Sequence, residues 1–425
     1  MNSERNDGCE VTNDALFCDK CNKELVKQKN FNDNLDPAMI KSKCNCVNDN
    51  ISVARVVNDN VTVSDVSVAN GRTLELEAKK FIYVNKNTVP NSVAAYTVDN
   101  TGFVTSLLGS PFATNGNGSN NAFYGSKNEL IATNGKYLHI GNAADNTISV
   151  FSINKTTGNL TLVPGSPFAT GNIGGTIMSL AGTPNGKFLY VSSCNSLDID
   201  STLTNIVMFS VNAITGVLTN LGKFLYPFTS RINGMAVTPN GKFLVAALID
   251  INMLASFAIG TNGLLTNIGA VTGANISVTI TNSGNFVYSC QGGGNRLSIG
   301  IFTINLSGIL TFIGLFSDYS VGFYNNGQFS SVSPDDRFLY VSGNVYGGPV
   351  VLSGADTGVL TKLALYPATA SVLYPMTNAN GKLLYILGAN GNTNIYKVAT
   401  DGTLTLLNSF VVPDTLTPCI ETFPK

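Results

Sequence analysis

Short apolar or alternating runs, separated by Asn- and Gly-rich turns, fill most of the chain beyond residue 78. In residues 134–171 three such runs follow one another, at 136–140, 147–153 and 160–163. This pattern is typical of strands in stacked sheets. The turn before the third run ends at Gly158, and glycine suits the positive φ of a tight hairpin. The pattern predicts β-strands joined by hairpins.

Two landmarks of this stretch recur seven times. The turn glycine returns at spacings of 44 to 58 residues, as Gly102, Gly158, Gly216, Gly263, Gly308, Gly358 and Gly402. A strand of the NGKFLY type recurs at Lys80, Lys136, Lys187, Lys242, Asn285, Arg337 and Lys382. A further strand precedes most copies, for example at 235–238. Four strands in each of seven units predict an all-β, seven-bladed β-propeller over residues 79–425, closed by a C-terminal strand in 417–423.

The first 78 residues have a different composition. Residues 1–50 hold 16 of the 51 charged residues and five of the eight cysteines, so we interpret them as a polar, Cys-rich N-terminal arm. Residues 51–78 are a Val-rich segment that links the arm to the propeller. The related sequences VNDNISVARV and VNDNVTVSDVSV, from Val47 and Val57, predict strands outside the blades. They form either a small hairpin or an edge that pairs with another molecule.

Charge and hydropathy exclude several function classes. Charged residues make up 12% of the chain and the net charge is −1, which offers no basic field for nucleic acid. No apolar run approaches the ~20 residues that span a bilayer. The N-terminus lacks the apolar core of a secretory signal. We therefore expect no nucleic-acid partner, no membrane span and no classical export signal.

The order NGKFLYV, NTISVFSI, TGNLT and GSPF resembles the lactonase-type seven-bladed propellers, which include bacterial 6-phosphogluconolactonase. The resemblance covers about residues 79–423. It implies reactive His, Glu and Arg side chains that face the central channel near the start of the inner strands. Opening a lactone needs a base that activates water and donors that hold the oxyanion.

Few residues of this chain fit that chemistry. The single histidine, His139, lies on a strand expected to be second from the axis, so we interpret it as a packed strand residue. Arg231 and Glu129 are the weak catalytic candidates, and Arg231 is the one arginine near an inner strand. Glu129 and Glu421 are the only carboxylates in the inner-strand segments. The polar residues suited to a neutral or anionic ligand in the channel are Tyr124, Arg231, Tyr324, Gln328 and Tyr374.

Metal and cross-link chemistry concern the loops and the arm. Asp198 and Asp200 form a D-x-D loop that lacks the Gly and Glu of a calcium loop, so neither a metal nor any other cofactor is expected. The arm cysteines are expected to form intermolecular disulfides, because an odd number of thiols cannot pair internally. These are Cys9, Cys18, Cys21, Cys44 and Cys46. The alternatives are a zinc site formed by the last four and reduced thiols on a polar tail.

These features favour a structural, self-assembling subunit of a filament, or of a surface or spore layer. Its partners would be copies of itself, joined through the N-terminal arm by β-strand addition or disulfides. The alternatives are a lactone hydrolase of the 6-phosphogluconolactonase type and a peptide- or glycan-binding propeller. The missing channel histidine favours a non-enzymatic role, so no lactone hydrolysis is expected. The favoured location is a bacterial cell or spore surface, and the alternative is the cytoplasm.

Overall fold

The chain forms two compact units in the computed structural model, Met1–Ala78 and Lys79–Lys425. The structure describes residues 9–12, 15–18, 23–27, 54–57, 60–63, 80–99, 101–119, 130–133, 135–171, 175–195, 205–226, 230–273, 276–291, 296–320, 329–342, 348–366, 372–388, 391–415 and 419–423. No α-helix occurs in these ranges. Nor do they contain a helix that is long and apolar enough to cross a bilayer.

The described residues of the first unit form five short strands in two sheets. Strands β1 (Cys9–Thr12), β2 (Ala15–Cys18) and β3 (Lys23–Lys27) form one antiparallel sheet. Strands β4 (Ala54–Val57) and β5 (Asn60–Val63) pair with each other as a hairpin. These last two strands overlap the Val-rich repeats, which therefore pair within the chain.

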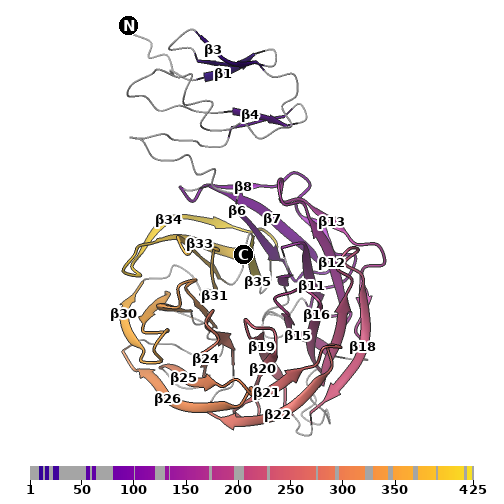
Figure 1. Cartoon of the computed structure of the whole chain (residues 1–425), viewed down its shortest axis with the longest axis vertical. Helices are drawn as coiled ribbons and strands as arrows, with labels where there is room; N and C mark the ends of the chain where they lie inside the picture. The colour runs from indigo at the N-terminus through magenta and orange to yellow at the C-terminus, as the bar shows by residue number, and fades with distance from the viewer. Residues whose placement is uncertain are drawn as a thin grey trace. The chain divides into compact units, whose positions relative to one another are not determined.

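The second unit is a ring of seven antiparallel sheets, and the seven-bladed propeller predicted from the repeat is confirmed (Figure 1). From the inner to the outer strand, blade 1 is β35 (Cys419–Phe423), β6 (Lys80–Asn85), β7 (Ser92–Val98) and β8 (Val104–Ser106), and blade 2 is β10 (Leu130–Thr133), β11 (Tyr137–Asn142), β12 (Thr147–Ile153) and β13 (Leu160–Leu162). The short strands β9 (Phe112–Ala113) and β14 (Phe168–Ala169) add to β7 and β12.

The other five blades have four strands each. Blade 3 is β15 (Gly175–Gly182), β16 (Phe188–Asn195), β17 (Asn205–Val211) and β18 (Leu218–Leu225), and blade 4 is β19 (Ile232–Val237), β20 (Phe243–Leu248), β21 (Met253–Ile259) and β22 (Leu265–Thr272). Blade 5 is β23 (Thr279–Ile280), β24 (Phe286–Cys290), β25 (Leu297–Ile304) and β26 (Leu310–Asp318). Blade 6 is β27 (Phe329–Val332), β28 (Phe338–Ser342), β29 (Val350–Ser353) and β30 (Thr361–Leu365), and blade 7 is β31 (Val372–Thr377), β32 (Leu383–Gly388), β33 (Asn392–Val398) and β34 (Leu404–Val411).

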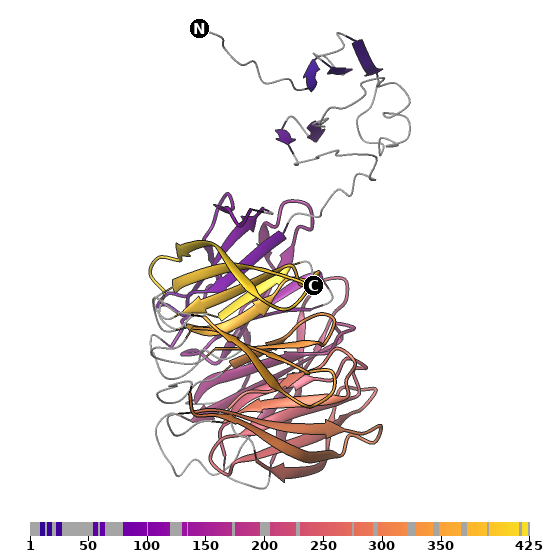
Figure 2. The same ribbon diagram turned by 90° about the vertical axis from the view of Figure 1, so that its left-hand side faces the viewer.

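The ring closes through a strand from the other end of the unit. Strand β35 pairs antiparallel with β6, from Cys419 opposite Asn85 to Phe423 opposite Phe81. Each inner strand also contacts the next one around the axis, and β35 contacts β10 to complete the circle. Seen from the side, the blades stack face to face (Figure 2). This closure gives β6 a partner on both sides, β35 and β7, so that blade 1 is a complete sheet like the others.

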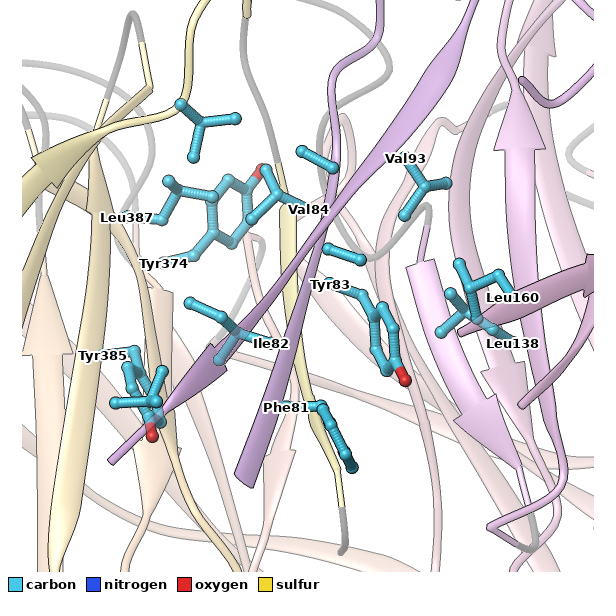
Figure 3. Close-up of a cluster of buried hydrophobic side chains, with 14 of the residues drawn as sticks. Phe81, Ile82, Tyr83, Val84, Val93, Leu138, Leu160, Tyr374, Tyr385 and Leu387 are labelled. Atoms are coloured by element: carbon cyan, nitrogen blue, oxygen red, sulfur yellow. The ribbon is translucent and has the colours of Figure 1, made fainter. Parts of the chain in front are cut away.

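The apolar core lies between neighbouring blades, because both faces of each sheet are covered. On β6, Ile82 and Val84 point toward Tyr374 and Leu387 of blade 7, whereas Tyr83 points toward blade 2 (Figure 3). All five side chains are at least nine-tenths buried. Alternate residues of a strand point to opposite sheet faces, so one strand contributes to two inter-blade layers.

The two sequence landmarks meet at these inter-blade layers. The aromatic residue that opens a second strand packs on the hairpin glycine of the following blade. The pairs are Phe81 with Gly158, Tyr137 with Gly216, Phe188 with Gly263, Phe243 with Gly308, Phe286 with Gly358 and Phe338 with Gly402. At the last junction Leu407 of blade 7 takes this place against Gly102. The NGKFLY-type strand and the hairpin glycine therefore form one contact between neighbouring blades.

Candidate functional site at the start of the inner strands

The seven inner strands surround the axis of the ring and are called the channel wall below. Each is the edge strand of its sheet, so the backbone groups of its axial edge have no hydrogen-bonded partner strand. Short hydroxyl side chains satisfy several of them across blade boundaries. The Met235 N–H donates to Ser179 Oγ at 3.1 Å. The Thr279 hydroxyl donates to the Ser330 carbonyl at 2.8 Å, and Thr422 donates to the Thr377 carbonyl at 3.1 Å. These hydrogen bonds join the inner strands of neighbouring blades around the axis.

Arg231 lies at one end of this wall, directly before β19. Its guanidinium binds Asp250, which follows the end of β20, with Nη2 to Oδ1 at 2.6 Å and Nε to both carboxylate oxygens at 3.1 Å. The Arg231 backbone N–H adds a fourth bond to Asp250 Oδ2 at 2.7 Å. The side chains remain 41% and 37% exposed. The pair is firmly positioned and still accessible to a solute.

The electrostatics of this pair keep both groups charged. Burial by itself raises the pKa of Asp250, but the hydrogen bonds and the positive charge of Arg231 outweigh it and hold that pKa below the ordinary value. Asp250 is therefore ionised at neutral pH and a weak proton acceptor. Its contribution is to orient the guanidinium.

A β-bulge follows Arg231 in the same inner strand. The pairing of β19 with β20 skips Asn233, between Ile232 and Gly234. Asn233 is 2% exposed, and its amide nitrogen has no hydrogen-bond acceptor among the described residues. Similar bulges interrupt β15 and β31 near their starts. Bulges reorient side chains and are frequent next to active sites.

Glu421 is the only carboxylate within the seven inner strands. It lies on β35 opposite Tyr83, is 2% exposed, and its Oε1 accepts the Thr422 N–H at 2.9 Å. Its side chain points to the sheet face opposite that of Thr422, whose hydroxyl bonds to blade 7. The expected partner Glu129 lies outside the described residues, although β10, which follows it, contacts β35.

His139 is fully buried on the second strand of blade 2, as the sequence indicated. It pairs with Ile131 and Val150 in the centre of that sheet. Burial lowers the pKa of His139 to about 3, because the cationic form would lose its hydration. The chain's only histidine therefore stays neutral at physiological pH and does not face the channel.

The remaining candidates divide into two groups. Tyr374 is 6% exposed and packs on Phe329 with ring centroids 4.4 Å apart, which places its ring in the core between blades and not on the channel surface. The others lie outside the described side chains: Tyr124, Tyr324, Gln328, Asp198, Asp200, Cys9, Cys18, Cys21, Cys44 and Cys46. Within the described part of the chain, no cluster of His, Cys, Asp or Glu could hold a metal.

Sequence reasoning identified Arg231 but missed Asp250 and Asn233. Asp250 is 19 residues away along the chain, and it reaches Arg231 because the second strand runs antiparallel to the first and ends where the first begins. The sequence LVAALID could have identified Asp250. A carboxylate that directly follows the second strand of a blade lies next to the residue that directly precedes the first strand, because the two strands are antiparallel. Asn233 gave no signal, because a bulge has no distinct residue pattern.

Comparison with known proteins confirms the resemblance to the lactonase-type propellers. The family model "Lactonase, 7-bladed beta-propeller" matches residues 132–279, from blade 2 to the start of blade 5. A 6-phosphogluconolactonase of Serratia proteamaculans is 29% identical over 116 residues. That match covers 27% of this chain and 32% of the relative's length.

Two solved structures show the same fold. A candidate 6-phosphogluconolactonase from Bacteroides fragilis is 20% identical, with a TM-score of 0.66 over 83% of this chain and 99% of its own. The periplasmic gluconolactonase of Pseudomonas aeruginosa is 14% identical, with a TM-score of 0.63 over 81% of this chain and 98% of its own.

These matches overturn the expected structural role. The filament, spore-layer and disulfide assignments relied on the cysteine arm and on the missing histidine, and the relatives point instead to the lactonase alternative. The error arose because a missing histidine was taken as a missing site. Carboxylate and guanidinium groups can also supply acid–base and oxyanion chemistry.

Proposed function

We propose that the propeller hydrolyses a sugar lactone of the 6-phosphogluconolactone type at the end of the channel where the inner strands begin. The observation that carries this proposal is the Arg231–Asp250 pair. It lies at the channel end where the resemblance implies reactive groups, and within the stretch that matches the lactonase model. The candidate substrate is anionic, and an exposed, pre-oriented guanidinium is suited to an anion.

Lactone hydrolysis sets the chemical requirements of the site. A water oxygen bonds to the carbonyl carbon and the carbonyl oxygen becomes an oxyanion. The ring C–O bond then breaks, the ring oxygen takes up the proton that the base removed from the water, and the carboxylic acid product ionises to a carboxylate. A base must take a proton from the water, and donors must stabilise the oxyanion.

Arg231 is the proposed anion contact and Asp250 its positioning residue. The Asn233 amide, two residues further along, is a second donor. His139 cannot serve as the base, because its pKa is about 3 and it lies on the second strand of blade 2 and not on an inner strand. Glu421 is the proposed base, because it is the only carboxylate in the seven inner strands.

The test compares Arg231→Ala with Arg337→Ala. Arg337 pairs with Asp335 at 2.7 Å on a turn at the opposite end of the strands, so it controls for loss of a surface ion pair. Hydrolysis of 6-phosphogluconolactone is measured above the spontaneous rate by enzymatic detection of 6-phosphogluconate. Arg231→Ala should raise KM at least tenfold for the phosphorylated lactone and less for gluconolactone, whereas Arg337→Ala should not change either.

Glu421→Gln tests the base. It keeps the size of the side chain and should lower kcat about a hundredfold or more while KM changes little. Wild-type protein that hydrolyses neither lactone above background would refute the proposed function. Turnover that survives in Glu421→Gln would refute only the assigned base.

A further inference from the structure

One face of the propeller has a polarised charge distribution that the net charge of −1 does not reveal. This face carries the turns between first and second strands and the hairpins between third and fourth strands. Hydrogen bonds join the two kinds of turn: Lys136 Nζ donates to the Ala213 carbonyl at 3.3 Å, and the Tyr137 hydroxyl donates to the Ile214 carbonyl at 2.6 Å. Both kinds of turn therefore lie on the same face of the ring.

The charged residues on this face are unevenly distributed among the blades. The described turns of blades 2 to 5 (135–136, 154–158, 183–187, 212–216, 238–242, 260–263, 281–285 and 305–308) carry four lysines and no carboxylate. Those lysines are Lys136, Lys155, Lys187 and Lys242, and all four are exposed. The corresponding turns of blades 6, 7 and 1 carry the five carboxylates of Asp99, Asp335, Asp336, Asp356 and Asp401, together with the two cations Arg337 and Lys382. One half of the face is therefore cationic.

Two large apolar side chains project from the same half. Ile214, at the hairpin tip of blade 3, is 87% exposed, and Leu306, at the tip of blade 5, is 95% exposed. The turns do not require them, since Thr156 takes the place of Ile214 in blade 2 and Thr261 takes the place of Leu306 in blade 4. Both tips are firmly held. Asn212 Oδ1 accepts the Ile214 N–H at 2.9 Å, and Asn305 Oδ1 accepts the Ser307 N–H at 2.9 Å.

Each tip lies beside one of the lysines. Lys136 is bonded to the residue that precedes Ile214. Lys242 directly precedes Phe243, whose ring packs on Gly308, two residues after Leu306. Apolar side chains that project from cationic turns suit a surface with anionic headgroups above an apolar layer. A protein partner would instead need pockets for both tips and acidic groups between them.

We propose that the hairpin face of blades 2 to 5 docks reversibly on an anionic lipid membrane, with Ile214 and Leu306 entering the interface and the four lysines lying over the headgroups. The docking surface is separate from the Arg231 end of the strands. Binding there would leave that end turned away from the bilayer and open to solutes.

The experiment is co-sedimentation of the full chain with vesicles of phosphatidylcholine alone and of phosphatidylcholine mixed with phosphatidylglycerol, at low and high salt. Wild-type protein should bind only the anionic vesicles, and salt should weaken binding. Ile214→Thr and Leu306→Thr copy the residues of neighbouring blades and should each lower partitioning about tenfold. Lys187→Gln and Lys242→Gln should each lower it about fivefold.

Leu108→Thr is the matched control, because Leu108 is 88% exposed and lies outside these turns. It should bind vesicles as the wild type does. Circular dichroism and thermal unfolding check that every variant is folded. Failure of the wild type to bind anionic vesicles at low salt would overturn the proposal, and so would binding that the tip and lysine variants do not reduce. A protein partner captured through these residues without vesicle binding would replace the membrane with a protein surface.

Discussion

The Tyr83 hydroxyl donates a 2.7 Å hydrogen bond to the carbonyl of Gly158, 75 residues further along the chain. Tyr83 lies on the second strand of blade 1 and Gly158 in the hairpin of blade 2. Tyr190 makes the same bond to Gly263 at 3.1 Å, and Tyr288 makes the equivalent bond to Ala355 at 2.8 Å. The tyrosine of the NGKFLY repeat therefore joins its blade to the hairpin of the next blade by a hydrogen bond, which is called the tyrosine tether below.

Removing this tether should destabilise the ring by a measurable amount. Tyr83→Phe leaves the Gly158 carbonyl without its buried donor and should lower the free energy of unfolding by about 1 kcal/mol. Tyr385 is the matched control, because its buried hydroxyl has no hydrogen-bond partner among the described residues. Tyr385→Phe should be neutral or slightly stabilising. Urea unfolding measures both, and equal losses would contradict the tether.

Gly158 combines a positive φ of 77° with close contact to Phe81. A Cβ would lie 2.3 Å from that ring, so Gly158→Ala should cost about 1–3 kcal/mol from overpacking. The left-handed backbone adds about 1–2 kcal/mol. Gly222 separates the two effects, because its φ is 107° and nothing lies within 4 Å of a Cβ there. Gly222→Ala should show only the backbone cost, and an equal loss at both sites would exclude the packing effect.

His139 should make stability depend on pH in the acidic range. Its pKa is lowered from 6.5 to about 3 in the folded protein, so between these values the unfolded chain binds more protons. Its contribution is fully present above pH 6.5 and is lost as the pH falls toward 3. The slope from this group is at most about 1.4 kcal/mol per pH unit. Urea unfolding at several pH values should show a smaller slope for His139→Phe, and an unchanged slope would contradict this assignment.

Deletion of residues 419–425 should prevent stable closure of the ring. It removes β35, and with it five register pairs to β6 and the Thr422 bond to Thr377. The edge of β6 would then face the channel without a partner. Thermal unfolding should show a lower Tm and a broader transition than for a control that lacks only residues 424–425. A cooperative transition at the wild-type Tm would contradict the role of β35.

Much of the fold could be predicted from sequence because its repeat is local. Strand alternation and the Asn- and Gly-rich turns are set by neighbouring residues, and the hairpin glycine repeats them at spacings of 44 to 58 residues. They therefore identified seven units of four strands. The candidate site could not be derived in this way. Arg231 was visible, but its partner Asp250 and the bulge at Asn233 depend on the pairing of β19 with β20.

By itself the sequence determined the strand period, the number of blades and the positions of the turn glycines, because backbone preference and side-chain alternation are encoded in neighbouring residues. Only the tertiary structure decided that the aromatic of one landmark packs on the glycine of the other, one blade away. It also decided that Arg231 contacts Asp250. Lysines from two different kinds of turn, those between first and second strands and those between third and fourth strands, lie on the same face of the ring. Such contacts depend on the pairing of strands within a blade or on the packing of one blade against the next, which neighbouring residues in the sequence do not specify.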